Sequence, residues 1–158
     1  MTVRPHSSSI SKDELLSLVR AQSGHFVYES GYHSDTWWDL EALCHRPAAL
    51  LPYVNVLATR IQEYKPDVVC GALVEGAFVA LLAASNLHAD FAYALRSGGD
   101  PKQLFSVSYH LPNALHDVVK GKRVVIANDV ISACFGKNFV CGYPTIVHFV
   151  PLAAFLII

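Results

Sequence analysis

The segment Val124-Val-Ile-Ala-Asn-Asp-Val-Ile-Ser-Ala133 joins a strongly apolar run to polar side chains that could bind a ligand. The run Val124–Ala127 is typical of a buried central strand, and Asn128 and Asp129 follow at its carboxyl end. Open α/β sheets bind their ligands at this end of their strands. The small residues and the hydroxyl group that come next would let backbone N–H groups approach a phosphate. The pattern therefore predicts a site for a phosphorylated ligand with a carboxylate beside it.

Two further segments carry residues that could serve the same chemistry. The segment Cys70-Gly-Ala-Leu-Val-Glu-Gly76 ends a second apolar strand and has two glycines around a loop. The segment Arg96-Ser-Gly-Gly-Asp-Pro-Lys-Gln103 is polar and rich in helix and strand breakers, so we expect a loop that presents Arg96 and Lys102. Each segment alone also has an ordinary interpretation, namely packing glycines, a capping Glu75, surface charges, or an Asn-Asp turn without a ligand.

The apolar pattern of the chain predicts the elements that must position these segments. In chain order they are a helix over Ile10–Ser23, extended segments over Gly24–Gly31 and Tyr32–Leu40, a helix over Ala48–Tyr64, a strand over Val68–Ala72, a helix over Gly76–Asn86, and strands over Phe91–Leu95, Phe105–Leu111 and Val124–Ala127. Short apolar strands separated by helices favour a parallel sheet with helices packed on its faces. We therefore expect a single α/β domain.

Residues 134–158 do not follow the pattern of the rest of the chain. They contain one lysine and no acid or arginine. Glycines and a proline interrupt the helix that is expected after the Val124–Ala127 strand. Thr145–Ile158 could supply one buried strand, broken by Pro151. We treat this segment as an atypical apolar tail, and one explanation is a shifted reading frame after about Ala133.

Composition excludes several classes of function. The 158 residues are 53% hydrophobic and 16% charged, which excludes a disordered chain. A net charge of −1 gives no electrostatic indication of nucleic-acid binding. The apolar runs are too short for a membrane-spanning helix, and the N-terminus has no apolar signal core, so we expect a cytoplasmic location and reduced cysteines. The cysteine and histidine spacing gives no zinc-site pattern.

Taken together, the segments resemble the type I phosphoribosyltransferases. Val124–Ala133 is similar to the family's phosphoribosyl-diphosphate-binding motif, in which an apolar strand and two acidic residues precede Val-Ile-Ser/Thr-Ala-Gly-Ser/Thr. Gly24–Ser34 is similar to the hood element Gly-x-Phe-x-x-x-Ser-Gly-x-x-Ser of the orotate phosphoribosyltransferase branch. Cys70–Gly76 resembles its pyrophosphate-binding loop, and Arg96–Ser108 stands where that branch has a mobile catalytic loop.

This resemblance implies a fold and a reaction. The fold would be a parallel sheet flanked by helices, with a small N-terminal hood over residues 10–45, a core over 46–133 and the tail over 134–158. Such enzymes transfer the phosphoribosyl group of phosphoribosyl diphosphate to a nitrogenous base and release pyrophosphate, with Mg²⁺ on the diphosphate. In the orotate branch the reaction serves pyrimidine nucleotide biosynthesis or salvage. The resemblance also implies a homodimer, although no residue demonstrates one.

The resemblance assigns roles residue by residue. Asp129 would hold the ribose hydroxyls and favour the cationic ring, and Arg96 or Lys102 would close over the site on a loop hinged by glycines. The residues expected to contact substrate are Asn128, Val130, Ile131, Ser132 and Ala133 on the ribose-phosphate side, Gly71, Ala72, Leu73, Val74, Glu75 and Gly76 on the pyrophosphate side, and His33 in the hood.

Four departures from the family pattern leave a second interpretation open beside the transferase. Asn128 replaces an acid, Glu75 stands where a lysine is common, and the hood residues Glu29, Tyr32 and His33 replace basic residues, so an anionic base such as orotate fits poorly. Cys134-Phe-Gly-Lys137 replaces the end of the phosphate loop. A non-catalytic protein of the same fold that senses phosphoribosyl diphosphate or a nucleotide therefore stays open. A generic Rossmann nucleotide binder lacks the expected Gly-x-Gly-x-x-Gly.

Overall fold

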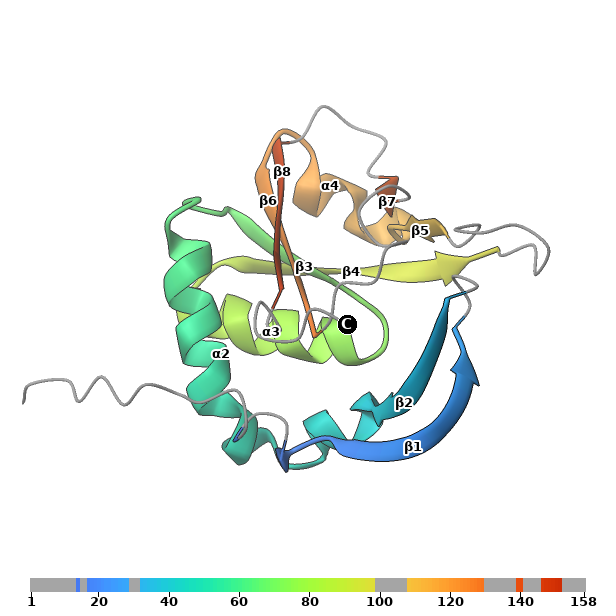
Figure 1. Cartoon of the computed structure of the whole chain (residues 1–158). Coiled ribbons are helices and arrows are strands. Elements are labelled where there is room, and N and C mark those ends of the chain that lie inside the picture. The colour runs from blue at the N-terminus through green and yellow to red at the C-terminus, as the bar shows by residue number, and fades with distance from the viewer. Residues whose placement is uncertain are drawn as a thin grey trace, which may run out of the picture.

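The computed structural model describes residues 14, 17–28, 32–98, 108–129, 139–140 and 146–151. Within them, two sheets are present. A two-stranded hairpin curves away from a larger six-stranded sheet, and helices cover both faces of the larger sheet (Figure 1). No helix in these residues is long and apolar enough to span a membrane.

The hairpin consists of β1 (Arg20–Val27) and β2 (His33–Asp39), which pair antiparallel with a β-bulge between Ser23 and Phe26. The predicted extended segments in this region are confirmed. The predicted helix over Ile10–Ser23 is wrong at its carboxyl end, because β1 already begins at Arg20. Pairing of this end of β1 with the end of β2, where Ala21 lies opposite Trp38, overrides the local helical pattern.

The six-stranded sheet has the strand order β7-β5-β4-β3-β6-β8. Its bounds are β3 (Val68–Ala72), β4 (Asp90–Ser97), β5 (Ser108–His110), β6 (Arg123–Asn128), β7 (Phe139–Val140) and β8 (Ile146–Pro151). Strands β4, β3, β6 and β8 run in parallel, whereas β5 is antiparallel to β4. The predicted parallel α/β arrangement is therefore confirmed. The tail that departs from the family pattern nevertheless adds a strand beside β6, and that strand ends at Pro151.

Helices α2 (Pro47–Gln62) and α3 (Glu75–Leu87) cover one face of this sheet, preceded by the short helix η1 (Leu40–His45). On α2, the apolar stripe predicted from the sequence is fully buried, and each leucine or isoleucine in it contributes about 1.5–3 kcal/mol of burial free energy. Trp38 and Leu40 pack against the same core, so the hairpin is anchored to the face that carries α3.

The opposite face of the sheet is covered by a smaller layer, η2 (Asn113–Leu115) and α4 (His116–Val119). A second apolar cluster lies there and includes Val68, Cys70, Ile126 and Val119. Alternate residues of β3 and β6 thus enter two different cores, because successive side chains of a strand point to opposite faces. Burial on both faces explains why these strands are apolar throughout rather than alternating.

Candidate functional site

Strands β3 and β6 deliver two of the predicted site segments to one edge of the sheet. They are neighbours and run in parallel, with Val68 opposite Val124 and Cys70 opposite Ile126. The chain therefore leaves both strands at the same edge. Asn128 is the last residue of β6 and is 8% exposed, and Asp129 follows it and is 6% exposed. A carboxylate this buried at the carboxyl edge of a parallel sheet stands where such sheets bind ligands.

The loop from Gly71 to Gly76 connects β3 to the start of α3 at this same edge. The Leu73 N–H donates to the Ala94 carbonyl of β4 at 2.9 Å, and the Leu73–Val74 peptide bond is cis. The hydrogen bond ties the loop to β4, the neighbour of β3 on the side away from β6. The loop is thus held between a fixed strand and the first turn of a helix.

Close packing joins this loop to the end of β6. A Cβ atom placed on Gly76 would overlap Asn128 Oδ1, and a Cβ atom on Gly71 would overlap the Gly76 carbonyl oxygen. Glycine is therefore required at both positions because other groups occupy the space of a side chain. The two segments that the sequence analysis assigned to one site are in direct contact.

We expect Gly76→Ala to lower the free energy of unfolding by about 1–2 kcal/mol, because the buried Asn128 amide must rotate away from the added methyl group. In an Asn128→Ala background the obstacle is gone, and the better helix propensity of alanine should make the same substitution neutral or stabilising. Urea denaturation of the four proteins of this double-mutant cycle measures the coupling. Equal effects of Gly76→Ala in both backgrounds would contradict the contact.

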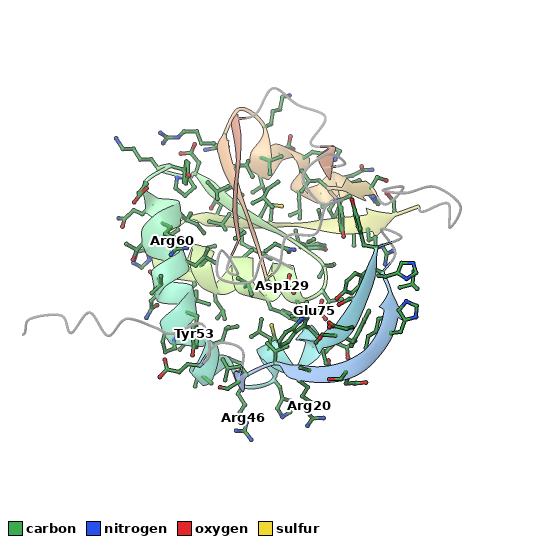
Figure 2. All side chains as sticks on the ribbon, in the orientation of Figure 1. Arg20, Arg46, Tyr53, Arg60, Glu75 and Asp129 are labelled. Carbon is green, nitrogen blue, oxygen red and sulfur yellow. The ribbon has the colours of Figure 1, made fainter. Side chains whose placement is uncertain are left out.

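The charges of two carboxylates, Asp129 and Glu75, both reach the Cys44 thiol. Glu75 is the first residue of α3, and Asp129 follows β6; both are labelled in Figure 2. Cys44 of η1 donates a hydrogen bond from its thiol to the Glu75 backbone carbonyl, with a sulfur–oxygen distance of 4.0 Å. Burial, the charge of Asp129 and the charge of Glu75, in that order, raise the pKa of Cys44 to about 11. The site is therefore electronegative.

This pKa predicts slow alkylation of Cys44. At pH 8 a thiol with a pKa near 11 is about 0.1% thiolate, against about 10% for an ordinary thiol of pKa 9.0, and only the thiolate reacts. The rate of reaction with iodoacetamide should keep rising up to about pH 11. Asp129→Asn should accelerate the reaction at pH 8 more than Glu75→Gln does, followed by mass spectrometry of the peptide that contains Cys44. If both variants react at the wild-type rate, the two charges do not reach the thiol.

Two further predicted site residues, Arg96 and His33, lie on β4 and β2. Arg96 is exposed near the end of β4 and, by strand alternation, belongs to the sheet face of Ala92 and Ala94. His33 is exposed at the start of β2, and its ring is hydrogen-bonded to His25. Lys102, Val130, Ile131, Ser132 and Ala133 lie outside the described residues.

Sequence reasoning missed Cys44. The sequence places it in a stretch without a recognisable motif, and its proximity to Asp129 arises because η1 brings the end of the hairpin back across the start of α3. The two tryptophans of β2, Trp37 and Trp38, have different surroundings. Trp38 packs against the core, whereas Trp37 is 42% exposed and contacts the rings of Phe26 and Tyr28.

The donor set of the site suits a hard divalent cation. Asp129 and Glu75 supply carboxylate oxygens, and the described residues contain no cluster of three or more histidine, cysteine or acidic side chains of the kind that encloses a metal ion. Mg²⁺ is usually held by one or two carboxylates together with substrate phosphates and water, so two acids are sufficient. The residues present therefore fit Mg²⁺ that arrives with a phosphorylated substrate.

Comparison with known proteins gives relatives of one kind by sequence. No family model matches the chain. An orotate phosphoribosyltransferase from Caldanaerobacter subterraneus is 28% identical over 111 residues, which is 69% of this chain and 53% of that protein. The chain thus spans about half the length of this curated relative.

Solved structures extend the likeness to the fold. The orotate phosphoribosyltransferase of Aeropyrum pernix superposes with a TM-score of 0.58 at 19% identity, covering 87% of this chain and 88% of that one. The adenine phosphoribosyltransferase of Leishmania donovani superposes with a TM-score of 0.59 at 20% identity, covering 89% of this chain and 66% of that one. In sequence the chain is similar to orotate phosphoribosyltransferases, and its fold is that of the type I phosphoribosyltransferases.

Proposed function

We propose that this protein transfers the phosphoribosyl group of phosphoribosyl diphosphate to a nitrogenous base, with release of pyrophosphate. The observation that carries the proposal is the buried Asp129 at the carboxyl edge of a parallel sheet, packed beside the Gly71–Gly76 loop through the contact of Asn128 with Gly76. The sequence relatives support the same reaction, since two curated proteins that match the chain are orotate phosphoribosyltransferases.

In this proposal each described group has a task that follows from its position. The Asp129 carboxylate faces the ribose and stabilises the positive charge that the sugar ring develops as the bond to pyrophosphate breaks. The Asn128 amide hydrogen-bonds to ribose hydroxyls without adding charge. The backbone of the Gly71–Gly76 loop approaches the diphosphate because neither glycine has a side chain in the way. Val130 to Ala133 would hold the 5′-phosphate, Lys102 would act from a closing loop, and Arg96 would act from the end of β4.

Mg²⁺ is the cofactor that this arrangement calls for. Glu75 and Asp129 together would repel a diphosphate, and a divalent cation between them and the phosphates removes that repulsion. When bound, Mg²⁺ would neutralise the charge that develops on the leaving pyrophosphate. We therefore propose that binding of phosphoribosyl diphosphate by this chain depends more steeply on Mg²⁺ than it would with a lysine at position 75.

The identity of the base is proposed only by class. Negative charge from Glu75 and Asp129 disfavours a carboxylated base such as orotate relative to an uncharged one. We propose a neutral pyrimidine or purine base as the acceptor, within nucleotide biosynthesis or salvage. The protein would work in the cytoplasm without nucleic-acid or membrane partners. A homodimer would cover the exposed apolar side chains of the α3 region, Val74, Phe78 and Leu81.

Two measurements test the proposal. Isothermal titration with phosphoribosyl diphosphate, with and without Mg²⁺, measures binding, and a coupled pyrophosphate assay with orotate, uracil, adenine and hypoxanthine measures transfer. Mg²⁺-dependent binding together with release of pyrophosphate supports the enzyme. Binding without release with any of these bases supports the sensor of the same fold, and absence of binding contradicts both.

A further inference from the structure

A pair of histidines lies on the exposed surface of the β1–β2 hairpin. His25 Nε2 and His33 Nδ1 are 2.7 Å apart, and the two rings stack with centroids 4.9 Å apart and an angle of 29° between their planes. The residues come from adjacent strands. His25 lies within the β-bulge between Ser23 and Phe26, and His33 pairs with Val27. Bulges redirect side chains, and this one brings His25 alongside the ring of its neighbour.

The two nitrogens face each other across a hydrogen bond. In the metal-free pair, one ring N–H donates to the unprotonated nitrogen of the other ring, and the tautomer decides which ring is the donor. A metal ion can take the place of the shared proton when the two rings turn so that both nitrogen lone pairs point at the ion, which lies to one side of the line joining the nitrogens. When two imidazole nitrogens each bind a metal ion at about 2.0–2.1 Å with an N–metal–N angle of 90°, the nitrogens lie about 2.9 Å apart. In a tetrahedral site they lie about 3.3 Å apart.

We propose that His25 and His33 form a two-histidine chelating site for a late first-row divalent cation, Cu²⁺ or Ni²⁺ in preference to Zn²⁺. Nitrogen ligands bind Cu²⁺ most tightly among the first-row divalent ions, and from the hydrogen-bonded separation of 2.7 Å the rings need only a small movement to occupy adjacent corners of a square-planar or octahedral site. Both rings are exposed, so the ion reaches them from solvent. The described residues bring no third ligand of the usual kind to the pair, so water or an added ligand completes the coordination.

The charge around the pair favours a cation. Asp35 lies two residues after His33 on the same side of β2 and is exposed, and its carboxylate accepts a hydrogen bond from the Thr36 hydroxyl at 2.9 Å. The site differs in chemistry from the Asp129–Glu75 site, because imidazole nitrogens bind Cu²⁺ and Ni²⁺ and carboxylate oxygens bind Mg²⁺. The inference does not rest on the proposed transferase activity.

Calorimetric titration with Ni²⁺ tests the inference on the whole chain, because Ni²⁺ does not oxidise cysteine thiols. Wild-type protein should bind one Ni²⁺ with an affinity that excess Mg²⁺ does not change. His25→Asn and His33→Asn should each weaken this binding about 100-fold, since a chelating pair gains that much over a single ligand. The matched control is His88→Asn, because His88 is exposed and its left-handed backbone accepts asparagine. It should bind as wild type does.

A second readout separates chelation from an unrelated loss of structure. One equivalent of Cu²⁺ should give an electron paramagnetic resonance spectrum with hyperfine coupling to two imidazole nitrogens, reduced to one in either variant. Circular dichroism tests whether each variant is folded. If one of the two hairpin variants is not folded, the other variant tests the chelation. Wild-type affinity in both hairpin variants, or an equal loss in His88→Asn, would overturn the proposal.

Discussion

Replacing Asp129 by asparagine is expected to lower the kcat/KM of phosphoribosyl transfer about 100-fold or more. The substitution keeps the size and shape of a residue that is 6% exposed, but it removes the negative charge that would face the cationic ribose. Loss of one preorganised electrostatic group at a developing charge typically costs this much. If the chain binds phosphoribosyl diphosphate without turnover, the substitution should instead lower the affinity for the magnesium complex of that ligand. Initial rates of pyrophosphate release measure kcat/KM, and calorimetry measures the affinity.

The matched control for this prediction is Asp117→Asn. Asp117 is an exposed acid in the first turn of α4, on the other face of the sheet, and its removal changes the net charge of the protein equally. It should leave transfer within about twofold of wild type. Faster alkylation of Cys44 in Asp129→Asn would show that the charge is gone while the site is still assembled. Turnover of Asp129→Asn within threefold of wild type would refute the catalytic assignment.

The part of the site that the sequence predicts well is the part encoded by adjacent residues. The apolar run before Asn128 and Asp129 predicts a strand, because parallel strands buried on both faces are apolar throughout. The two polar residues that follow it are then expected at the end of that strand. Gly71 and Gly76 are recognisable because they lie in a short segment at the end of a second apolar strand. The atoms that exclude a side chain there are the Gly76 carbonyl, which is close to Gly71 in sequence, and the Asn128 side chain, which pairing of β3 with β6 brings to Gly76.

The part that sequence reasoning misses depends on contacts between distant segments. Cys44 meets Glu75, which is 31 residues away, only after η1 packs against α3. The helix expected over Ile10–Ser23 yields to β1 because Arg20 and Ala21 find partners in β2. The contact of His33 with His25 is a further example, because His25 reaches His33 through a bulge that strand alternation alone does not predict.

Gly71→Ala is expected to be the most destabilising small substitution at the site. A Cβ atom there would overlap the Gly76 carbonyl oxygen and lie 2.7 Å from the Ala80 Cβ atom. The obstacle is backbone in the first turn of α3, and it cannot rotate aside as a side chain does. The helix must move away from β3, at a cost of about 3 kcal/mol. For a chain of this size that corresponds to a fall of about 6 to 12 °C in Tm.

Differential scanning calorimetry of Gly71→Ala beside Gly121→Asn separates this clash from the loss of a glycine as such. Gly121 has a φ of +71°, no atom lies within 4 Å of a Cβ placed there, and asparagine tolerates that backbone conformation, so its Tm should stay within about 2 °C of wild type. A shift of α3 would also withdraw Gly76 from Asn128, so Gly71→Ala should bind phosphoribosyl diphosphate more weakly even at temperatures where it is folded. A Tm equal to that of wild type would mean that β3 and α3 are farther apart than the structure places them. The proposal that the backbone of the Gly71–Gly76 loop approaches a diphosphate closely would then lose its structural support.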